Sequence, residues 1–225
     1  AAWSVPGSNA GSFTTTAGAT TFTNIQRLTG GAGNDAFTLN GGTVSGAING
    51  GIGTNTLTAD NVANSWVISG ANAGTVTGIT GGFSNIANLI GGTNTDSFTL
   101  SGGTVSGSIN GGLTGANTLI ADNVANTWVI SGANSGTVTG VTGGFSNIAN
   151  LSGGSGNDAF TVGAGGSVSG VIDGGGQVAS DTLDYSAVTA AVTSKIGTNF
   201  TNIESVTGDG VNDTLVGADV ANTWS

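Results

Sequence analysis

The sequence repeats itself with a period of 61 or 62 residues, and this repeat constrains the fold more than any other feature. The segment Leu28–Gly31 returns as Leu89–Gly92 and again as Leu151–Gly154. Turn-like Gly residues divide each repeat further into steps of about 20 residues. Periods of this size are typical of stacked architectures, in which each unit is completed only by its neighbours.

Two columns of apolar residues emerge when the chain is aligned on these Gly residues. The first column lies six or seven residues after most turns and contains Phe13, Phe37, Leu57, Val76, Phe98, Leu119, Val138, Phe160, Leu183 and Leu215. The second lies two residues before each turn and contains Val5, Leu28, Ile48, Ile68, Leu89, Ile109, Ile130, Leu151, Ile172 and Val206. One 20-residue unit cannot bury its own apolar side, whereas stacked units align these residues into a continuous interior.

The segments between the turns are typical of β-strands. They are short, rich in Thr, Val, Ile and Phe, and bounded by Gly, Asn and Asp, and 44 Gly in 225 residues argue against helices. We therefore expect an all-β chain, a parallel β-solenoid (a β-helix or β-roll) of about ten coils of ~20 residues. Residues 1–225 would form one domain, with regular three-coil repeats in 1–172 and more acidic, irregular coils in 173–225. Trp66 and Trp128 lie two residues before members of the second column, so we expect them on its buried face.

Composition excludes several classes of protein. Gly does not recur at every third position, which excludes collagen, and 37% hydrophobic residues argue against disorder. No apolar run reaches the roughly 18 residues of a membrane-spanning helix, so we expect no membrane insertion. Two Lys and Arg residues stand against 12 Asp and Glu residues, which makes nucleic acid an unsuitable partner.

The chemistry available to an enzyme is also narrow. The chain has no His and no Cys, which excludes Ser-His and Cys-His nucleophiles and the usual zinc ligands. A carboxylate pair remains, with Asp181 and Asp184 close in sequence and Asp173 near them. Few aromatic or cationic residues surround this group in the sequence, so we expect the protein not to be an enzyme.

Two segments fit the nonapeptide pattern G-G-x-G-x-D-x-U-x, in which U is a large apolar residue: residues 30–38 and 153–161. In this pattern Gly permits a tight turn that exposes carbonyl oxygens, Asp supplies a carboxylate, and U anchors the turn in the core. Hard oxygen ligands of this kind suit Ca²⁺.

The two segments resemble the hemolysin-type calcium-binding (RTX-like) repeats of secreted bacterial proteins. Residues 180–186 and 200–208 look like stretches found in large bacterial surface proteins and adhesins with such repeats. The 61-residue pattern is also similar to strand-repeat and filamentous-haemagglutinin-like exoproteins. The resemblance implies an extracellular or bacterial cell-surface location and Ca²⁺ as a cofactor.

The column of Asp residues departs from the RTX-like pattern. It consists of Asp35, Asn55, Gly74, Asp96, Asn117, Gly136, Asp158, Asp181 and Asp213. Neutral residues interrupt the first six turns, so Asp35 and Asp96 are expected to cap turns by bonding to nearby backbone amides, with weak Ca²⁺ binding as the alternative. At the acidic end, Asp158, Asp181 and Asp213 would be consecutive, with Asp173 and Asp209 close by, and Ca²⁺ binding and capping stay equally open.

These features predict a structural or adhesive repeat segment of a secreted or cell-surface bacterial protein, which forms a rod, stalk or filament. Its partners would be further copies, stacked end to end or joined in a longer array, and surface glycans or other cells. One alternative is a Ca²⁺-binding module that folds or rigidifies on secretion. Another is an ice-binding solenoid with Thr pairs on a flat face, among them Thr56 with Thr58, Thr75 with Thr77 and Thr137 with Thr139. The residues Ala36, Ile120, Ala159 and Asp184 interrupt that array.

Overall fold

The computed structural model describes residues 1–176 and 180–220 and shows an all-β chain. These residues form 25 strands and no helix, which confirms the predicted fold class at this level. Accordingly, no helix capable of crossing a membrane occurs in the described part of the chain. Residues 177–179 and 221–225 of the acidic segment 173–225 lie outside the described residues.

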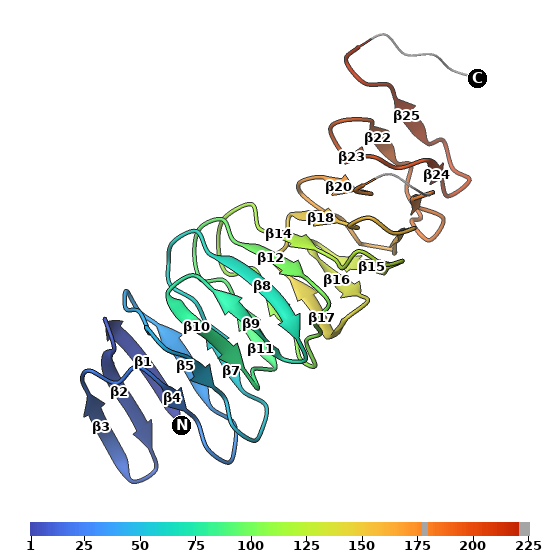
Figure 1. Cartoon of the computed structure of the whole chain (residues 1–225). Helices are drawn as coiled ribbons and strands as arrows, with labels where there is room; N and C mark the ends of the chain where they lie inside the picture. The colour runs from blue at the N-terminus through green and yellow to red at the C-terminus, as the bar shows by residue number, and fades with distance from the viewer. Residues whose placement is uncertain (177–179, 221–225) are drawn as a thin grey trace.

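Most strands belong to two long sheets that run through an elongated molecule (Figure 1). Sheet 1 has 13 strands: β1 (Ala2–Gly7), β2 (Ala10–Thr15), β3 (Gly18–Phe22), β5 (Ala36–Leu39), β7 (Thr56–Thr58), β11 (Asn88–Ile90), β13 (Ile109–Asn110), β15 (Thr127–Gly132), β16 (Ser135–Val138), β17 (Val141–Ser146), β19 (Ala159–Val162), β21 (Thr182–Asp184) and β24 (Ser205–Thr207). Sheet 2 has ten strands: β4 (Leu28–Thr29), β6 (Ile48–Asn49), β8 (Ser65–Gly70), β9 (Ala73–Val76), β10 (Ile79–Ser84), β12 (Ser97–Leu100), β14 (Thr118–Ile120), β18 (Asn150–Ser152), β20 (Ile172–Asp173) and β23 (Phe200–Thr201).

The chain alternates between the two sheets, and each returning strand pairs in parallel with an earlier strand of the same sheet. In sheet 2, Leu28 of β4 lies beside Ile48 of β6. In sheet 1, Phe37 of β5 lies beside Leu57 of β7. Residues 20 positions apart are therefore stacked at these steps, as the apolar columns predict.

Three-stranded antiparallel meanders interrupt this stacking. They consist of β1 to β3 and β15 to β17 in sheet 1 and of β8 to β10 in sheet 2. After the meander in sheet 2, Leu89 pairs with Leu57, a step of 32 residues. Val76 therefore lies in sheet 2 and not above Leu57, and the uniform 20-residue stacking expected from the sequence is wrong at the meanders. Asn72 starts the turn between β8 and β9 with a φ of 53°, and Gly78 lies in the next turn with a φ of 87°.

Within each 61- or 62-residue repeat the chain joins a sheet five times: four times with a single strand and once with a three-stranded meander. Because five is odd, successive repeats begin in opposite sheets: β4 in sheet 2, β11 in sheet 1 and β18 in sheet 2. Neighbouring repeats are thus related by a half turn about the long axis, and the meanders alternate between the sheets for the same reason.

The core lies between the two sheets and runs along their length. Trp66 and Trp128 are fully buried, which confirms their predicted position. Their rings stack on Phe98 and Phe160, with ring centroids 5.3 and 5.4 Å apart. Each aromatic pair joins two neighbouring parallel strands, so the largest side chains hold adjacent coils together.

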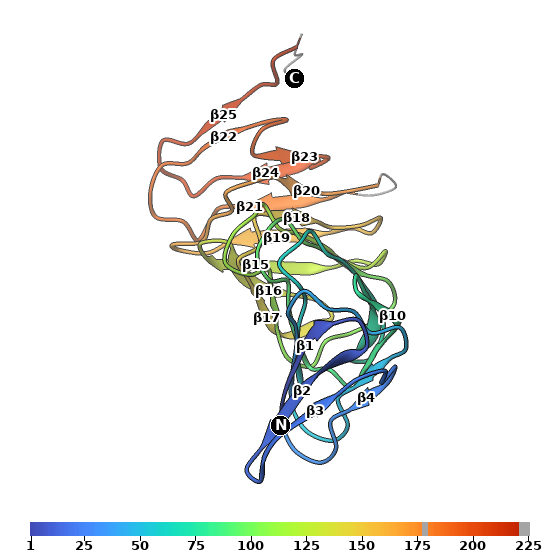
Figure 2. The same ribbon diagram turned by 90° about the vertical axis from the view of Figure 1, so that its left-hand side faces the viewer.

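The C-terminal part departs from the two-sheet pattern (Figure 2). β22 (Thr193–Lys195) and β25 (Thr214–Val216) form a separate two-stranded parallel sheet. Leu215 of β25 is 44% exposed, so its predicted place in the buried column is wrong. Tyr185, Val188 and Val192 help to line a cavity of about 210 Å³ beside this small sheet.

Candidate functional site

Asp and Asn side chains are buried at the turns that precede the strands. They are Asp35, Asn55, Asn64, Asp96, Asn117, Asn126, Asp158 and Asp181. Each of them stands directly before the first residue of a strand. Because the strands of one sheet are stacked, these side chains are stacked as well and form ladders along the two edges of the molecule.

We call each buried Asp or Asn side chain a rung of its ladder. Hydrogen bonds from backbone amides to side chains join successive rungs. The backbone N–H of Asp35 donates to Asn55 Oδ1 at 2.8 Å, and that of Asp96 donates to Asn117 Oδ1 at 2.8 Å. The N–H of Asn126 likewise donates to Asp158 Oδ1 at 2.8 Å. The side chains therefore cap backbone amides, and the capped amide belongs to the preceding coil rather than to the residue's own turn.

The Asn rungs form a second bond towards the next coil. Asn55 Nδ2 donates to the carbonyl oxygen of Asn85, and Asn117 Nδ2 to that of Asn147, both at 3.0 Å. The amides of the other two Asn rungs donate to Gly carbonyls, Asn64 to Gly91 at 3.0 Å and Asn126 to Gly153 at 2.9 Å. Asn55 and Asn117 thus each satisfy one amide below and one carbonyl above, which binds three successive coils together.

Two ladder positions differ from the predicted Asp column. Gly74 and Gly136 lie inside meander strands, and their expected rungs are supplied by Asn64 and Asn126. The antiparallel meander offers no preceding turn amide to these Asn residues, and their Oδ1 atoms are buried without a hydrogen-bond partner. The repeated segment A-D-N-V-A-N at 59–64 and 121–126 is the sequence signal that marks them.

At the acidic end, three consecutive rungs carry carboxylates. The N–H of Asp158 donates to Asp181 Oδ1 at 2.7 Å, and the N–H of Asp181 donates to Glu204 Oε2 at 2.8 Å. Glu204 therefore occupies the rung expected for Asp213. Burial raises the pKa of Asp181, and the carboxylates of Glu204 and Asp173 raise it further.

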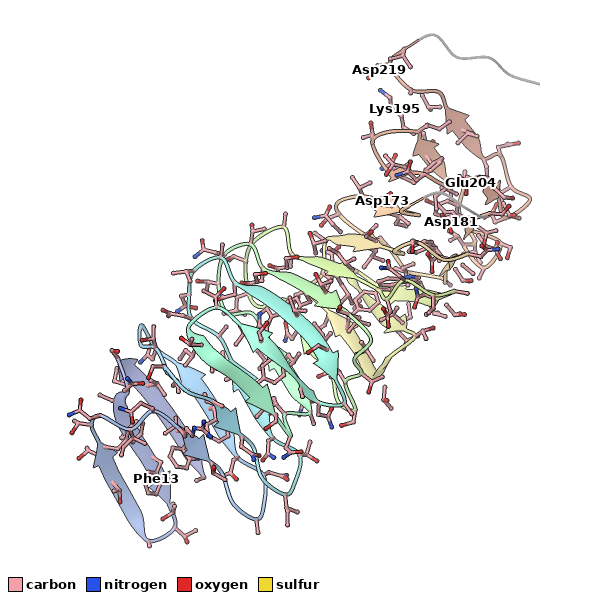
Figure 3. The ribbon with its side chains drawn as sticks, in the orientation of Figure 1. Phe13, Asp173, Asp181, Lys195, Glu204 and Asp219 are labelled. Carbon is pink, nitrogen blue, oxygen red and sulfur yellow. The ribbon has the colours of Figure 1, made fainter. Side chains whose placement is uncertain are left out.

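The other predicted residues of this end lie elsewhere. Figure 3 labels Asp173, Asp181 and Glu204 in this acidic end. Asp173 accepts hydrogen bonds from Asn202 Nδ2 at 2.7 Å and Thr201 Oγ1 at 3.2 Å. Asp213 accepts bonds from backbone amides, among them those of Val192 and Asp209, and these bonds hold the pKa of Asp213 below its ordinary value. Within residues 1–176 and 180–220, no three acidic side chains gather as a metal-binding group.

The outer faces of the sheets carry small polar side chains in register. In sheet 1, Thr58 pairs with Thr38 on one side and Ile90 on the other. Thr75 lies in sheet 2 and Thr137 in sheet 1. The Thr pairs considered for ice binding are thus divided between two opposite faces rather than gathered on one.

Three comparisons with known proteins complete this description. No family model, no curated protein and no solved structure matches the chain. The ladders, the core and the faces described above are therefore the basis for inferring a function.

Proposed function

We propose that the chain is a parallel β-solenoid and serves as a structural or adhesive rod segment of a secreted or cell-surface bacterial protein. The observation that carries this proposal is the continuity of the two sheets, which follow the molecule from β4 to β24 and are joined coil to coil by the buried Asp and Asn ladders. A stack of this kind distributes its stability over many similar interfaces, as a stalk or fibre requires.

The chemistry of the side chains agrees with a mechanical role. The buried carboxylates of Asp96, Asp158 and Asp181 accept hydrogen bonds from backbone amides, so they act in the architecture. The outward-facing positions of the regular strands are mainly Thr, Ser and Asn, most of them half-buried, and these side chains can contact surface glycans or other cells through hydroxyl and amide groups. We propose no catalytic role for the chain, and we place it outside the cell on the resemblance to RTX-like and haemagglutinin-like exoproteins.

The rod proposal predicts a fixed gain in length when repeats are added. A second copy of residues 28–150, inserted after Asn150, brings seven strands to each sheet. At about 4.8 Å per strand the molecule should lengthen by about 34 Å without becoming wider. Small-angle scattering or electron microscopy measures both dimensions. A protein that gains width instead of length would contradict the rod.

The alternative, a Ca²⁺-binding module, predicts a different response to the cation. Because amide donors already bind the ladder carboxylates, we expect millimolar Ca²⁺ to leave the melting temperature unchanged relative to chelator. Circular dichroism melts at matched ionic strength, with Mg²⁺ as the control cation, make this comparison. A rise specific to Ca²⁺ would favour the binding module over a purely structural segment.

A further inference from the structure

Four rungs, Asp35, Asp96, Asp158 and Asp181, place a carboxyl oxygen where Asn55 and Asn117 place a donor. In two of them, Asp96 and Asp158, this oxygen is buried without a hydrogen bond. At Asn55, the amide Nδ2 and the Asn85 carbonyl oxygen both lie against the Cα of Gly50, and they are hydrogen-bonded. At Asp96, the carboxyl Oδ2 and the carbonyl oxygen of Gly111 both lie against the Cα of Gly91. The same arrangement recurs one repeat later, where Asp158 Oδ2 and the carbonyl oxygen of Gly174 lie against Gly153.

Neither the Oδ2 atom of Asp96 nor that of Asp158 has a hydrogen-bond donor beside it. Asp96 is 0% exposed and Asp158 is 1% exposed, and the Oδ2 atom of each is buried without a hydrogen bond. The Oδ1 atoms are used, since they accept bonds from the backbone and side chain of Asn64 and Asn126. Each Oδ2 and a carbonyl oxygen of the next coil therefore pack against the same Gly in a dry site. Two lone-pair acceptors cannot bond to each other without a proton between them.

Neither basic side chain of the protein lies beside the Oδ2 atom of Asp96 or of Asp158. Of the two basic side chains, Lys195 pairs with Asp219 at 2.7 Å and Arg27 lies at the turn of Gly46.

The groups packed around Asp96 and Asp158 are neutral or acidic. The turns above and below Asp96 supply the neutral amides of Asn64 and Asn117. The turn of Asn64 also carries the acidic Asp60, whose Oδ1 accepts the amides of Gly41 and Asn61. Around Asp158 stand the neutral Asn126 and the acidic Asp181, with Glu204 on the following rung and Asp122 on the preceding turn.

We propose that Asp96 and Asp158 are neutral carboxylic acids in the folded protein, each donating its proton to the carbonyl oxygen of the next coil, so that acid tightens the stack. In this form each side chain imitates Asn: Oδ1 accepts from the coil below, and the Oδ2 hydroxyl donates to Gly111 or Gly174 in the coil above. The rod would thus have a pH-dependent joint in each of two successive repeats.

The direction of the pH dependence follows from the pKa values. Burial raises the pKa of Asp96 and of Asp158 above the ordinary value, and the nearby Asp181 carboxylate adds to the increase for Asp158. The contribution to stability is then complete below the ordinary carboxyl pKa of about 4, where both folded and unfolded chains are protonated. It is lost as the pH rises through the higher pKa of the folded state.

The substitution Asp96→Asn tests the proposal, because it supplies a permanent donor of nearly the same shape. At pH 8 we expect the melting temperature to rise by about 3–8 °C. At pH 4 the rise should disappear, because the wild-type carboxyl then carries its own proton. Circular dichroism melts from pH 4 to pH 8 on wild type, Asp96→Asn and Asp158→Asn give the comparison.

The reverse substitution on the next rung is the matched control. Asn117→Asp places a carboxyl oxygen against the Asn147 carbonyl, so its melting temperature should fall at pH 8 and recover towards pH 4. Carboxyl ¹³C shifts in a pH titration report protonation directly and should show two fewer protonated carboxyls near neutral pH in the double variant Asp96→Asn with Asp158→Asn.

Two results would overturn the proposal. One is a set of carboxyl shifts that all titrate at ordinary values, together with an Asp96→Asn variant that is no more stable than wild type at pH 8. The other is a Ca²⁺-dependent rise in wild-type stability that Asp96→Asn abolishes, since a cation rather than a proton would then lie between the two oxygens.

Discussion

The substitution Trp66→Ala is expected to lower the free energy of unfolding by about 3–5 kcal/mol. Trp66 is fully buried, and its ring contacts aromatic side chains on two other strands of sheet 2. It stacks on Phe98 of β12 at 5.3 Å and meets the edge of Phe83 in β10 at 5.7 Å. Truncation would leave a cavity at the point where a meander joins the regular coils, and a close-packed interior cannot refill such a space. Urea unfolding followed by Trp fluorescence or circular dichroism measures the loss.

The neighbouring residue provides the control for this prediction. Val67 follows Trp66 on β8 but points outward and is 36% exposed, so Val67→Ala should change the free energy of unfolding by less than about 1 kcal/mol. The repeat supplies a replicate, because Trp128 stacks on Phe160 and meets the edge of Phe145 in the same way. Equal losses for Trp66→Ala and Val67→Ala would mean that the core does not run between the two sheets.

The sequence predicted the buried positions better than it predicted their neighbours. Phe37 and Leu57 were placed in one column and are paired in sheet 1, because strand alternation and a 20-residue step specify both facts. The meanders were not foreseen, for a simple reason of length. The meander from Ser65 to Ser84 spans 20 residues, the same as one coil, so periodicity alone cannot distinguish three antiparallel strands from a full turn of the stack.

A local signal for the meander is nevertheless present in the chain. Residues 69–74 and 131–136 read S-G-A-N followed by a small residue and Gly. Asn72 and Asn134 in these segments adopt left-handed φ values of 53° and 52°, which tight reversals between antiparallel strands require. Turn chemistry, read before periodicity, would have separated the meanders from the coils.

For the ladder residues too, the sequence predicted the positions of the side chains but not their hydrogen-bond partners. The spacing from the turn glycines predicts Asp35, Asp96 and Asp158 as turn residues, and the structure places each of them directly before a strand. Their partners depend on which turns are stacked, and that depends on the meanders. Glu204 was missed as the rung beyond Asp181 because the sequence column counted only Asp, Asn and Gly, whereas the longer Glu side chain reaches the Asp181 amide at 2.8 Å.

The substitution Gly112→Ala should separate two coils and cost about 4–5 kcal/mol or more. Gly112 has a φ of +102°, and an added Cβ would overlap the carbonyl oxygen of Gly92 in the neighbouring coil. That oxygen accepts the N–H of Leu113 at 3.2 Å, so it cannot move away without breaking a bond between coils. All the nearest atoms belong to backbone, which leaves no flexible side chain to yield.

Gly102→Ala separates this steric effect from backbone strain. Gly102 also has a positive φ, +76°, but an added Cβ would meet nothing within 4 Å. Its replacement should therefore cost only the left-handed penalty of about 1–2 kcal/mol. Urea unfolding of the two variants side by side gives the difference, which measures how closely the backbones of adjacent coils approach. If Gly102→Ala and Gly112→Ala cost the same, glycine serves these turns only through its φ angle, and the close approach of the coils at Gly92 does not exist in solution.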